Sequence, residues 1–291
     1  MPQYVLENEY LTATFKTEGA ELTSVQDKAS GQEYIWQADP TVWARHAPVL
    51  FPIVGRLKDD TYQLNGDTYT MTQHGFARDM NFSVVDQSDD HITFGLTASP
   101  DTHAQYPFNF VLDIQYTLKD RQLEIVYRVT NQDQKEMPFS IGAHPAFYCP
   151  AQQEHHWEEY QLAFEKPETL VRHMIEDGLR NGKTEPLMDD EIALPLHRHL
   201  FEADAIVFEN LASDEVSIVR QSDGKSLITV KFPGFSYLGI WQKLGSDFFC
   251  IEPWYGVADS ITASGDLFEK EGMQRLSPEE QFEATHSIIF H

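Results

Sequence analysis

The sequence predicts an all-β protein made of antiparallel strands. The dominant hydrophobic period of its 291 residues is two, and several neighbouring β-rich runs are joined by a few polar residues, as in β-hairpins. Signals for helices are few. Because no linker rich in proline, serine or glycine divides the chain, we expect a single large β domain over residues 1–291.

Paired strands are predicted from the start of the chain onward. The segment YVLENEYLTATF, residues 4–15, begins the pattern with short β-rich runs. Three later pairs of apolar runs are separated by turn residues, and the last turn contains Asp-Gly, a strong turn-forming pair. We expect these hairpin turns at residues 87–90, 119–122 and 222–224.

Two other segments fit the pattern less simply. Ser277 and Pro278 favour the first turn of a helix, but the alternation of residues 282–291 favours a strand. Residues 151–203 are the least regular part of the chain and carry clustered charges. We expect long loops there that decorate the sheets.

The composition limits the classes of function. The chain has 46 aspartates and glutamates against 21 lysines and arginines, a formal net charge of −25. This balance argues against a nucleic-acid partner, which needs a basic surface, and disfavours binding to anionic membranes. Two cysteines, Cys149 and Cys250, do not make a disulfide framework or a zinc ribbon. With no apolar run as long as a membrane span and no leader pattern, we expect a cytoplasmic protein.

Five ionisable residues stand in segments that are largely apolar. Arg56 lies in HAPVLFPIVGRL, His74 and Arg78 in HGFAR, His144 in SIGAHPAFYCP, and Glu252 in FFCIEPWYG. Apolar surroundings shift pKa values, and acid–base catalysis depends on such shifts. We therefore expect a catalytic site in which the carboxylate acts as a base and a histidine acts as an acid.

A metal site is an alternative interpretation of some of these residues. His46, His74 and His144 together with Glu252 offer three imidazoles and a carboxylate, which suit several metals. Their spacings are long, and no HExxH motif is present. The segment LHRHLFEAD, which begins near residue 196, has the His-x-His alternation that cupin barrels use for metals.

A glycosidase is a second alternative. Such an enzyme needs a pair of carboxylates, and Asp204 with Glu252 would supply one. Asp204 is equally well explained as an acceptor for a hydroxyl group of a substrate.

Five segments, in chain order, resemble motifs of the aldose 1-epimerase (galactose mutarotase) family. They are HGFAR, IGAHPAF, FEADAIVFEN, YLGIWQK and CIEPWYG. The likeness extends from GAELTSVQDKASGQEYIW to CIEPWYGVAD, nearly the whole chain, and points to the bacterial branch that includes an epimerase-like protein of lactose operons. The resemblance implies a β-supersandwich of packed antiparallel sheets with few short helices.

The resemblance also implies a role for each matching residue. Glu252 corresponds to the general base, His144 to the general acid and His74 to an assisting histidine. A second set is expected to bind the sugar, with Trp254 offering a face to the ring. This set is Arg56, Asp204, Arg78 and Trp254.

The implied reaction is the interconversion of the α and β anomers of a free hexose by an isomerase. The base takes the proton of the C1 hydroxyl group while the acid protonates the ring oxygen, so neither a cofactor nor a metal is expected. Better-known galactose mutarotases differ from this chain around the first histidine, which leaves the sugar open. Two alternatives are a hexose-6-phosphate 1-epimerase, in which Arg56 and Arg78 assist phosphate binding, and a non-catalytic sugar-binding module. We expect a monomer or a homodimer whose partner is a small sugar.

Overall fold

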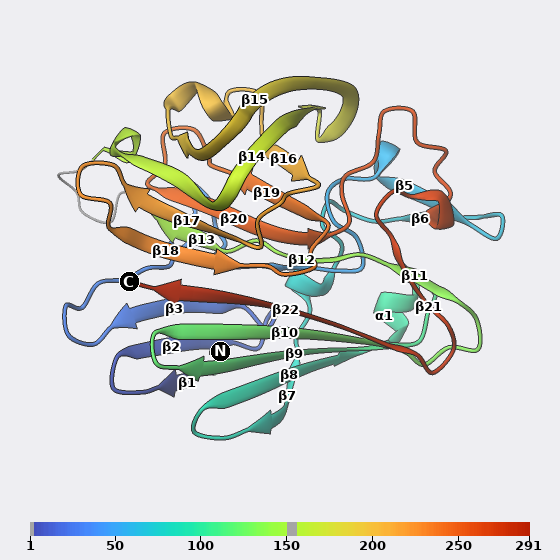
Figure 1. Cartoon of the computed structure of the whole chain (residues 1–291). Helices are drawn as coiled ribbons and strands as arrows, with labels where there is room; N and C mark the ends of the chain where they lie inside the picture. The colour runs from blue at the N-terminus through green and yellow to red at the C-terminus, as the bar shows by residue number, and fades with distance from the viewer. Residues whose placement is uncertain (1–2, 150–155) are drawn as a thin grey trace.

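The computed structural model describes residues 3–149 and 156–291, and nearly all of its regular structure is antiparallel β-sheet (Figure 1). The all-β class predicted from the sequence is therefore confirmed. In the described part of the chain the helices are short: α1 (Pro100–His103), η1 (Lys58–Asp60), η2 (Ala77–Asp79), η3 (Trp157–Glu159), η4 (Arg198–Phe201) and η5 (Leu267–Glu269).

The largest sheet has nine strands in the order β15-β14-β17-β18-β22-β10-β9-β8-β7. In Figure 1 it extends from β7 at the bottom of the view to β15 at the top. Its strands are β7 (Ser83–Gln87), β8 (His91–Thr97), β9 (Phe110–Lys119), β10 (Gln122–Asn131), β14 (Tyr160–Glu176), β15 (Leu179–Pro195), β17 (Glu215–Arg220), β18 (Ser226–Lys231) and β22 (Gln281–Phe290).

A second sheet of six strands carries most of the candidate site. Its order is β16-β19-β20-β12-β4, and β13 also pairs with β20, so β20 has neighbours on both sides. Its strands are β4 (Val49–Leu50), β12 (Ile141–Ala143), β13 (Ala146–Tyr148), β16 (Ile206–Glu209), β19 (Tyr237–Trp241) and β20 (Phe248–Tyr255).

Three smaller sheets complete the described structure. One has three strands and two have two strands each. Their strands are β1 (Gln3–Glu7), β2 (Leu11–Lys16), β3 (Leu22–Asp27), β5 (Thr61–Leu64), β6 (Asp67–Thr70), β11 (Met137–Phe139) and β21 (Gln274–Leu276).

The three predicted hairpins are confirmed. They are β7–β8, β9–β10 and β17–β18, and their short turns lie at the polar residues where the sequence predicted them. The alternation of residues 282–291 also forms the expected strand, β22, with a single turn before it in which the amide of Glu280 donates to the carbonyl of Ser277.

The prediction of long loops over residues 151–203 was wrong for most of that segment. Strands β14 and β15 have 17 residues each and form one long hairpin at the edge of the nine-stranded sheet; residues 151–155 lie outside the described part of the chain. Much of this hairpin is exposed, and its pairing contains register shifts. A strand without one continuously buried face has no need of alternating apolar residues, so the sequence shows charges instead.

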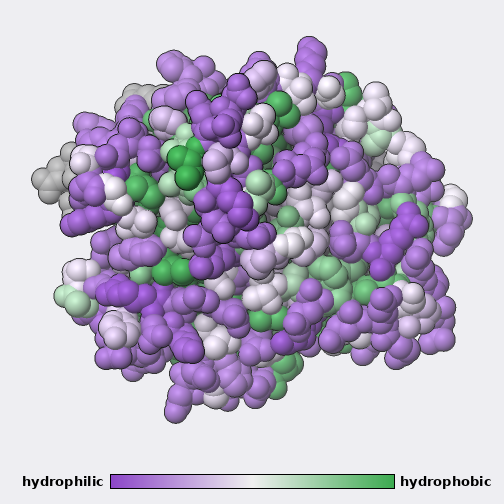
Figure 2. Space-filling model, in the orientation of Figure 1, coloured by the Kyte–Doolittle hydropathy of each residue, from purple (hydrophilic) through white to green (hydrophobic). Residues whose placement is uncertain are grey.

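The two large sheets share one apolar core. Ile125 of β10, Ile228 of β18 and Ile251 of β20 belong to the same buried cluster. Each such side chain contributes about 1.5–3 kcal/mol when fully buried. The face shown in Figure 2 is mostly hydrophilic, with small separate apolar patches. Among the described residues no helix is both long enough and apolar enough to cross a membrane.

Candidate active site

Glu252 is a buried carboxylate in the middle of the six-stranded sheet. It lies on β20 opposite Gly239 of β19, and its side chain is 1% exposed. Positions 248–254 are all buried, which explains the apolar and aromatic residues around the glutamate in the sequence. The sheet therefore holds this carboxylate away from bulk water. In such a buried position the charged form of the carboxylate costs free energy.

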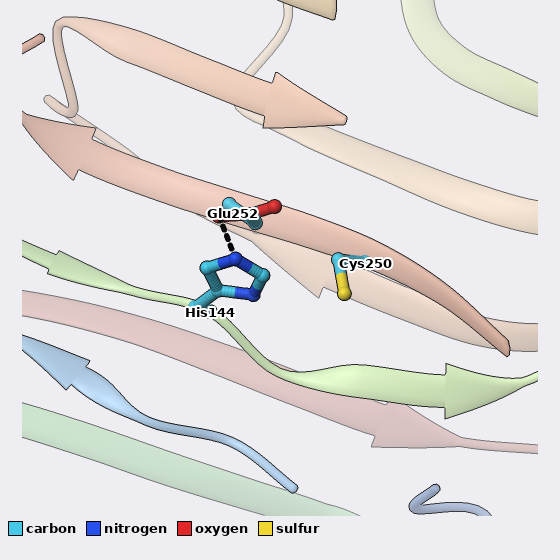
Figure 3. Close-up of side chains that lie close together, drawn as sticks. All are labelled: His144, Cys250 and Glu252. Carbon is cyan, nitrogen blue, oxygen red and sulfur yellow. Dashed lines mark ion pairs between the residues drawn. The ribbon is translucent and has the colours of Figure 1, made fainter. Parts of the chain in front are cut away.

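His144 faces Glu252 from the link between β12 and β13. Its Nε2 atom is 3.3 Å from Oε2 of the carboxylate (Figure 3). Trp43 stacks on the imidazole with ring centroids 5.1 Å apart, and Trp241 meets it edge-on at 5.6 Å. These indoles restrict the plane of the imidazole and keep Nε2 beside the carboxylate.

His74 lies next to His144, with the two ring centroids 5.6 Å apart. It comes from the segment between β6 and η2. The backbone amide of Gly55 donates to Nδ1 of His74 at 3.1 Å, so the neutral ring carries its proton on Nε2. Gly75, at φ 71°, makes the turn possible, because a Cβ atom there would lie 2.3 Å from the carbonyl oxygen of Phe51.

Burial shifts the pKa values of these three side chains toward their neutral forms. It raises the pKa of Glu252 well above its usual value, and the negative charge of Asp204 adds to this. It lowers the pKa of His144 to about 3 and that of His74 well below its usual value. Transfer of a proton from Glu252 to His144 across their 3.3 Å contact gives a carboxylate and an imidazolium without changing the net charge.

These side chains line a pocket of about 340 Å³. Six of the seven residues predicted for the site lie on its wall: His74, Arg78, His144, Asp204, Glu252 and Trp254. The pocket is closed on other sides by parts of the β14–β15 hairpin, which contributes Ile175 and Gly178. A volume of this order is at the lower end of typical small-molecule sites.

Trp254 is fixed on the wall by two glycines on neighbouring strands. A Cβ atom at Gly239 of β19 or at Gly142 of β12 would lie 2.5 Å from the indole. The indole nitrogen also donates to the carbonyl of Ala143 at 3.2 Å. Because neither glycine has a side chain, the two strands leave a space beside β20, and the indole of Trp254 fills it.

Arg78 and Asp204 bring opposite charges to the pocket. One terminal nitrogen of Arg78 donates to the carbonyl of Gln73 at 2.6 Å, while its Nε is buried and makes no hydrogen bond to a described residue. Burial lowers the pKa of Arg78 to about 10, and the charge of Arg45 adds to this. Asp204 has a left-handed backbone, φ 73°, and accepts a hydrogen bond from the amide of Ala205.

Arg56 is the one predicted site residue that the structure does not place on the pocket wall, as far as the described residues show. Its guanidinium binds both carboxylate oxygens of Asp60, at 2.7 and 2.8 Å, and donates to the carbonyl of Asp177. Its chain packs instead against Gly178, behind the wall. Asp60, four residues later in the chain, pairs with the charge of Arg56. The apolar residues before Arg56 gave no indication of this pairing.

The side chains proposed as metal ligands are only partly gathered. His46 lies beside Glu21, with Nδ1 3.5 Å from the carboxylate. Ligand atoms of His144, Cys250 and Glu252 do lie within 4.8 Å of one another (Figure 3). The thiol of Cys250, however, packs in a buried cluster with Trp36 and Phe248, and Cys250 is not on the wall of the pocket.

Sequence reasoning missed four polar or aromatic residues that line the pocket, besides several small and aliphatic ones. Gln73 precedes His74, and Trp241 and Lys243 belong to the YLGIWQK segment, so motif neighbourhood could have indicated them. Trp43 lies in an irregular stretch with no periodic signal and is brought to His144 only by the fold.

The comparisons with known proteins identify the family of the chain. A family model described as aldose 1-epimerase matches residues 2–271. The LacX proteins of Lactococcus lactis subsp. lactis, one plasmid-encoded and one chromosomal, are 34% identical over 293 residues, which covers 97% of this chain and 97% of each relative.

Solved structures resemble the whole fold. A galactose mutarotase related enzyme from Lactobacillus acidophilus is 35% identical, with a TM-score of 0.95, covering 100% of this chain and 97% of that one. A galactose mutarotase-like protein from Lactobacillus casei is 34% identical, with a TM-score of 0.93 and full coverage of both chains. The β-supersandwich expected from the sequence is thus confirmed.

Proposed function

Because this chain belongs to the aldose 1-epimerase family, we propose that it interconverts the α and β anomers of a free hexose by opening and reclosing the pyranose ring. The observation that carries the proposal is the 3.3 Å contact between Nε2 of His144 and Oε2 of Glu252 on the wall of a pocket of about 340 Å³. A proton donor and a proton acceptor that face one small cavity are the groups this reaction needs.

The proposed steps move two protons and leave no group behind. Glu252, as the carboxylate, takes the proton of the C1 hydroxyl group, and His144, as the imidazolium, gives a proton to the ring oxygen. The bond between C1 and the ring oxygen breaks, and an aldehyde forms. Rotation about C1–C2 presents the other face of the aldehyde. As the ring closes, neutral His144 takes the proton of the C5 hydroxyl group and protonated Glu252 gives its proton to the aldehyde oxygen.

The remaining wall residues have roles that fit a polar sugar with one apolar face. Asp204 accepts from sugar hydroxyl groups, and Arg78 donates to them. Trp254, held by Gly239 and Gly142, packs against the ring. His74, with its proton on Nε2, donates to an oxygen near C1.

Anomer-resolved NMR on α-D-glucose and α-D-galactose tests the proposal. We expect the wild-type protein to speed anomer exchange and His144→Ala to lose about 10²–10⁴-fold in kcat with an unchanged circular dichroism spectrum. Sugar binding detected by calorimetry without any rate enhancement would instead identify a binding module.

A hexose 6-phosphate is the second candidate substrate, because Arg78 and the exposed Lys243 both line the pocket. Arg56, which the sequence suggested for this role, is occupied by Asp60. Comparison of kcat/KM for glucose and glucose 6-phosphate decides between the candidates. If the phosphate is preferred, Lys243→Met should remove the preference and leave the rate with glucose unchanged.

A further inference from the structure

A second, much smaller cavity lies on the other side of His144. Its volume is about 20 Å³, and its wall includes His144, His286 and Tyr127 among mainly apolar side chains. A cavity needs about 10–15 Å³ to hold one water molecule, so this one has room for a single water. His144 therefore takes part in two cavities, one of substrate size and one of water size.

Both histidines on this small cavity have a buried nitrogen without a partner. Nδ1 of His144 and Nδ1 of His286 make no hydrogen bond of normal geometry to any described residue. In Figure 3 the second nitrogen of His144 lies on the side of its ring away from Glu252. A buried polar atom left without a hydrogen bond costs about 1–3 kcal/mol, so two such atoms on one cavity call for a shared partner.

His286 is buried among aromatic and apolar side chains. It lies on β22 opposite Ile125 of β10, is 2% exposed, and its ring is 5.4 Å from that of Tyr127 and 5.9 Å from that of Phe235. Burial lowers its pKa to about 3, so the ring is neutral and one of its nitrogens is an acceptor. Packing alone does not explain a histidine at this position.

We propose that one buried water molecule occupies the small cavity and joins Nδ1 of His144 to Nδ1 of His286, which makes His286 a positioning residue for His144. The water accepts a hydrogen bond from Nδ1–H of His144 and donates one to Nδ1 of His286. Tyr127 also lies on the wall of this cavity.

The link has a chemical consequence that rests on the proposed function. The imidazolium form of His144 has a proton on each nitrogen, and the proton on Nδ1 needs an acceptor while Nε2 serves the sugar. A water backed by a neutral histidine supplies that acceptor inside the core. It stabilises the charged form of His144 against desolvation and keeps Nε2 aimed into the pocket.

The structural part is tested without any substrate. The crystal structure of the wild-type protein should contain a water within hydrogen-bonding distance of both Nδ1 atoms. In ¹⁵N NMR of the imidazoles, the Nδ1 resonance of His144 should shift in His286→Phe and stay in place in Ile288→Val, a control that trims an apolar residue of the same cavity and strand. An empty cavity, or a His144 resonance that His286→Phe leaves unchanged, would overturn the proposal.

The catalytic part is tested by kinetics on the same variants. We expect His286→Phe to lower kcat by about 10- to 100-fold with little change in KM, because a hydrogen bond to a charged group is lost away from the substrate. The high-pH limb of the kcat profile should move to lower pH, since the imidazolium loses its acceptor. His286→Gln, whose amide oxygen can accept from the water, should recover most of kcat, and Ile288→Val should resemble the wild type.

The two proposals fail in different ways. A wild-type protein that does not catalyse anomer exchange refutes the proposed function, while the water and the NMR shift still decide the link between the histidines. An active enzyme in which His286→Phe keeps wild-type kcat and pH profile refutes the positioning role alone. A kcat that falls equally in His286→Phe, His286→Gln and Ile288→Val would show a packing effect and also refute it.

Discussion

Two buried pairs of ionisable side chains lie close to the pocket, and they differ in how completely they are satisfied. Nζ of Lys270 is 3.0 Å from Asp259 and donates to the carbonyl of Val257 at 2.5 Å, and Asp259 accepts a further hydrogen bond from the amide of Lys58. In the pair His144–Glu252, at 3.3 Å, one nitrogen and one carboxylate oxygen make no hydrogen bond to a described residue.

The difference separates a structural pair from a reactive one. Each charge of Lys270–Asp259 is used to hold backbone near Ala258, a residue of the pocket wall, in place. The pair His144–Glu252 keeps hydrogen-bonding capacity in reserve and carries pKa values displaced by burial, which are properties of groups that exchange protons. Both pairs are buried, so burial does not distinguish them. The difference is that, among the described residues, the hydrogen bonds of Lys270–Asp259 are complete and those of His144–Glu252 are not.

The largest expected effect comes from the reactive pair. Glu252→Gln should lower kcat for anomer exchange by about 10²–10⁴-fold, because the amide cannot accept the C1 proton. The free energy of unfolding should be equal to or higher than that of the wild type, since a buried carboxylate is removed. Polarimetry and urea denaturation measure the two quantities, with the exposed Glu269→Gln as control. A rate within 10-fold of the wild type would contradict the assignment.

The structural pair should respond in the opposite way. Lys270→Met leaves Asp259 buried without its cation and should lower the free energy of unfolding by about 3–5 kcal/mol. The folded fraction should keep kcat within about 10-fold of the wild type. The double variant Lys270→Met/Asp259→Leu should regain much of the stability, because no charge is left unpaired. A stable Lys270→Met with greatly reduced kcat would reverse the comparison.

Stability against pH sharpens the comparison further. A histidine whose pKa falls to about 3 on folding contributes stability that is complete above its unfolded value of about 6.5 and is lost as pH falls from there toward 3. In this window each such histidine adds a slope of about 1.4 kcal/mol per pH unit. His286→Phe should reduce the slope by that amount in urea titrations between pH 6.5 and 4. Ile288→Val, which removes no titratable group, should leave it unchanged.

The smallest effects concern the two arginines, which repeat the contrast between satisfied and unsatisfied groups. Arg78→Met should raise KM for the sugar by about 10-fold, as expected for a lost charge-assisted hydrogen bond in the pocket. Arg56→Met breaks a partly exposed pair with Asp60 and should leave stability nearly unchanged and change KM by less than about 3-fold. An equal rise of KM in both variants would place Arg56 at the sugar after all.

The sequence predicted the β-rich start of the chain, three hairpins, strand β22 and six of the residues on the pocket wall. Period-two patterns and polar turns are local signals, so hairpins such as β9–β10 could be read directly. The β14–β15 hairpin was not predicted because its exposed strands carry charges. The pairing of Arg56 with Asp60 was not predicted because it depends on the local conformation of residues 56–60. Trp43 and His286 act on His144 across long sequence separations, and single-sequence patterns carry no trace of such contacts.

The position of β22 has a consequence for how this protein is made. In chain order it follows every other strand of the nine-stranded sheet, yet it is the fifth in the spatial order, between β18 and β10. During synthesis the sheet must therefore wait as two halves with open edges until residues 281–290 emerge from the ribosome. Such edges recruit neighbouring chains, so crowded nascent chains should depend on chaperones, and His286 arrives with the strand that closes the gap.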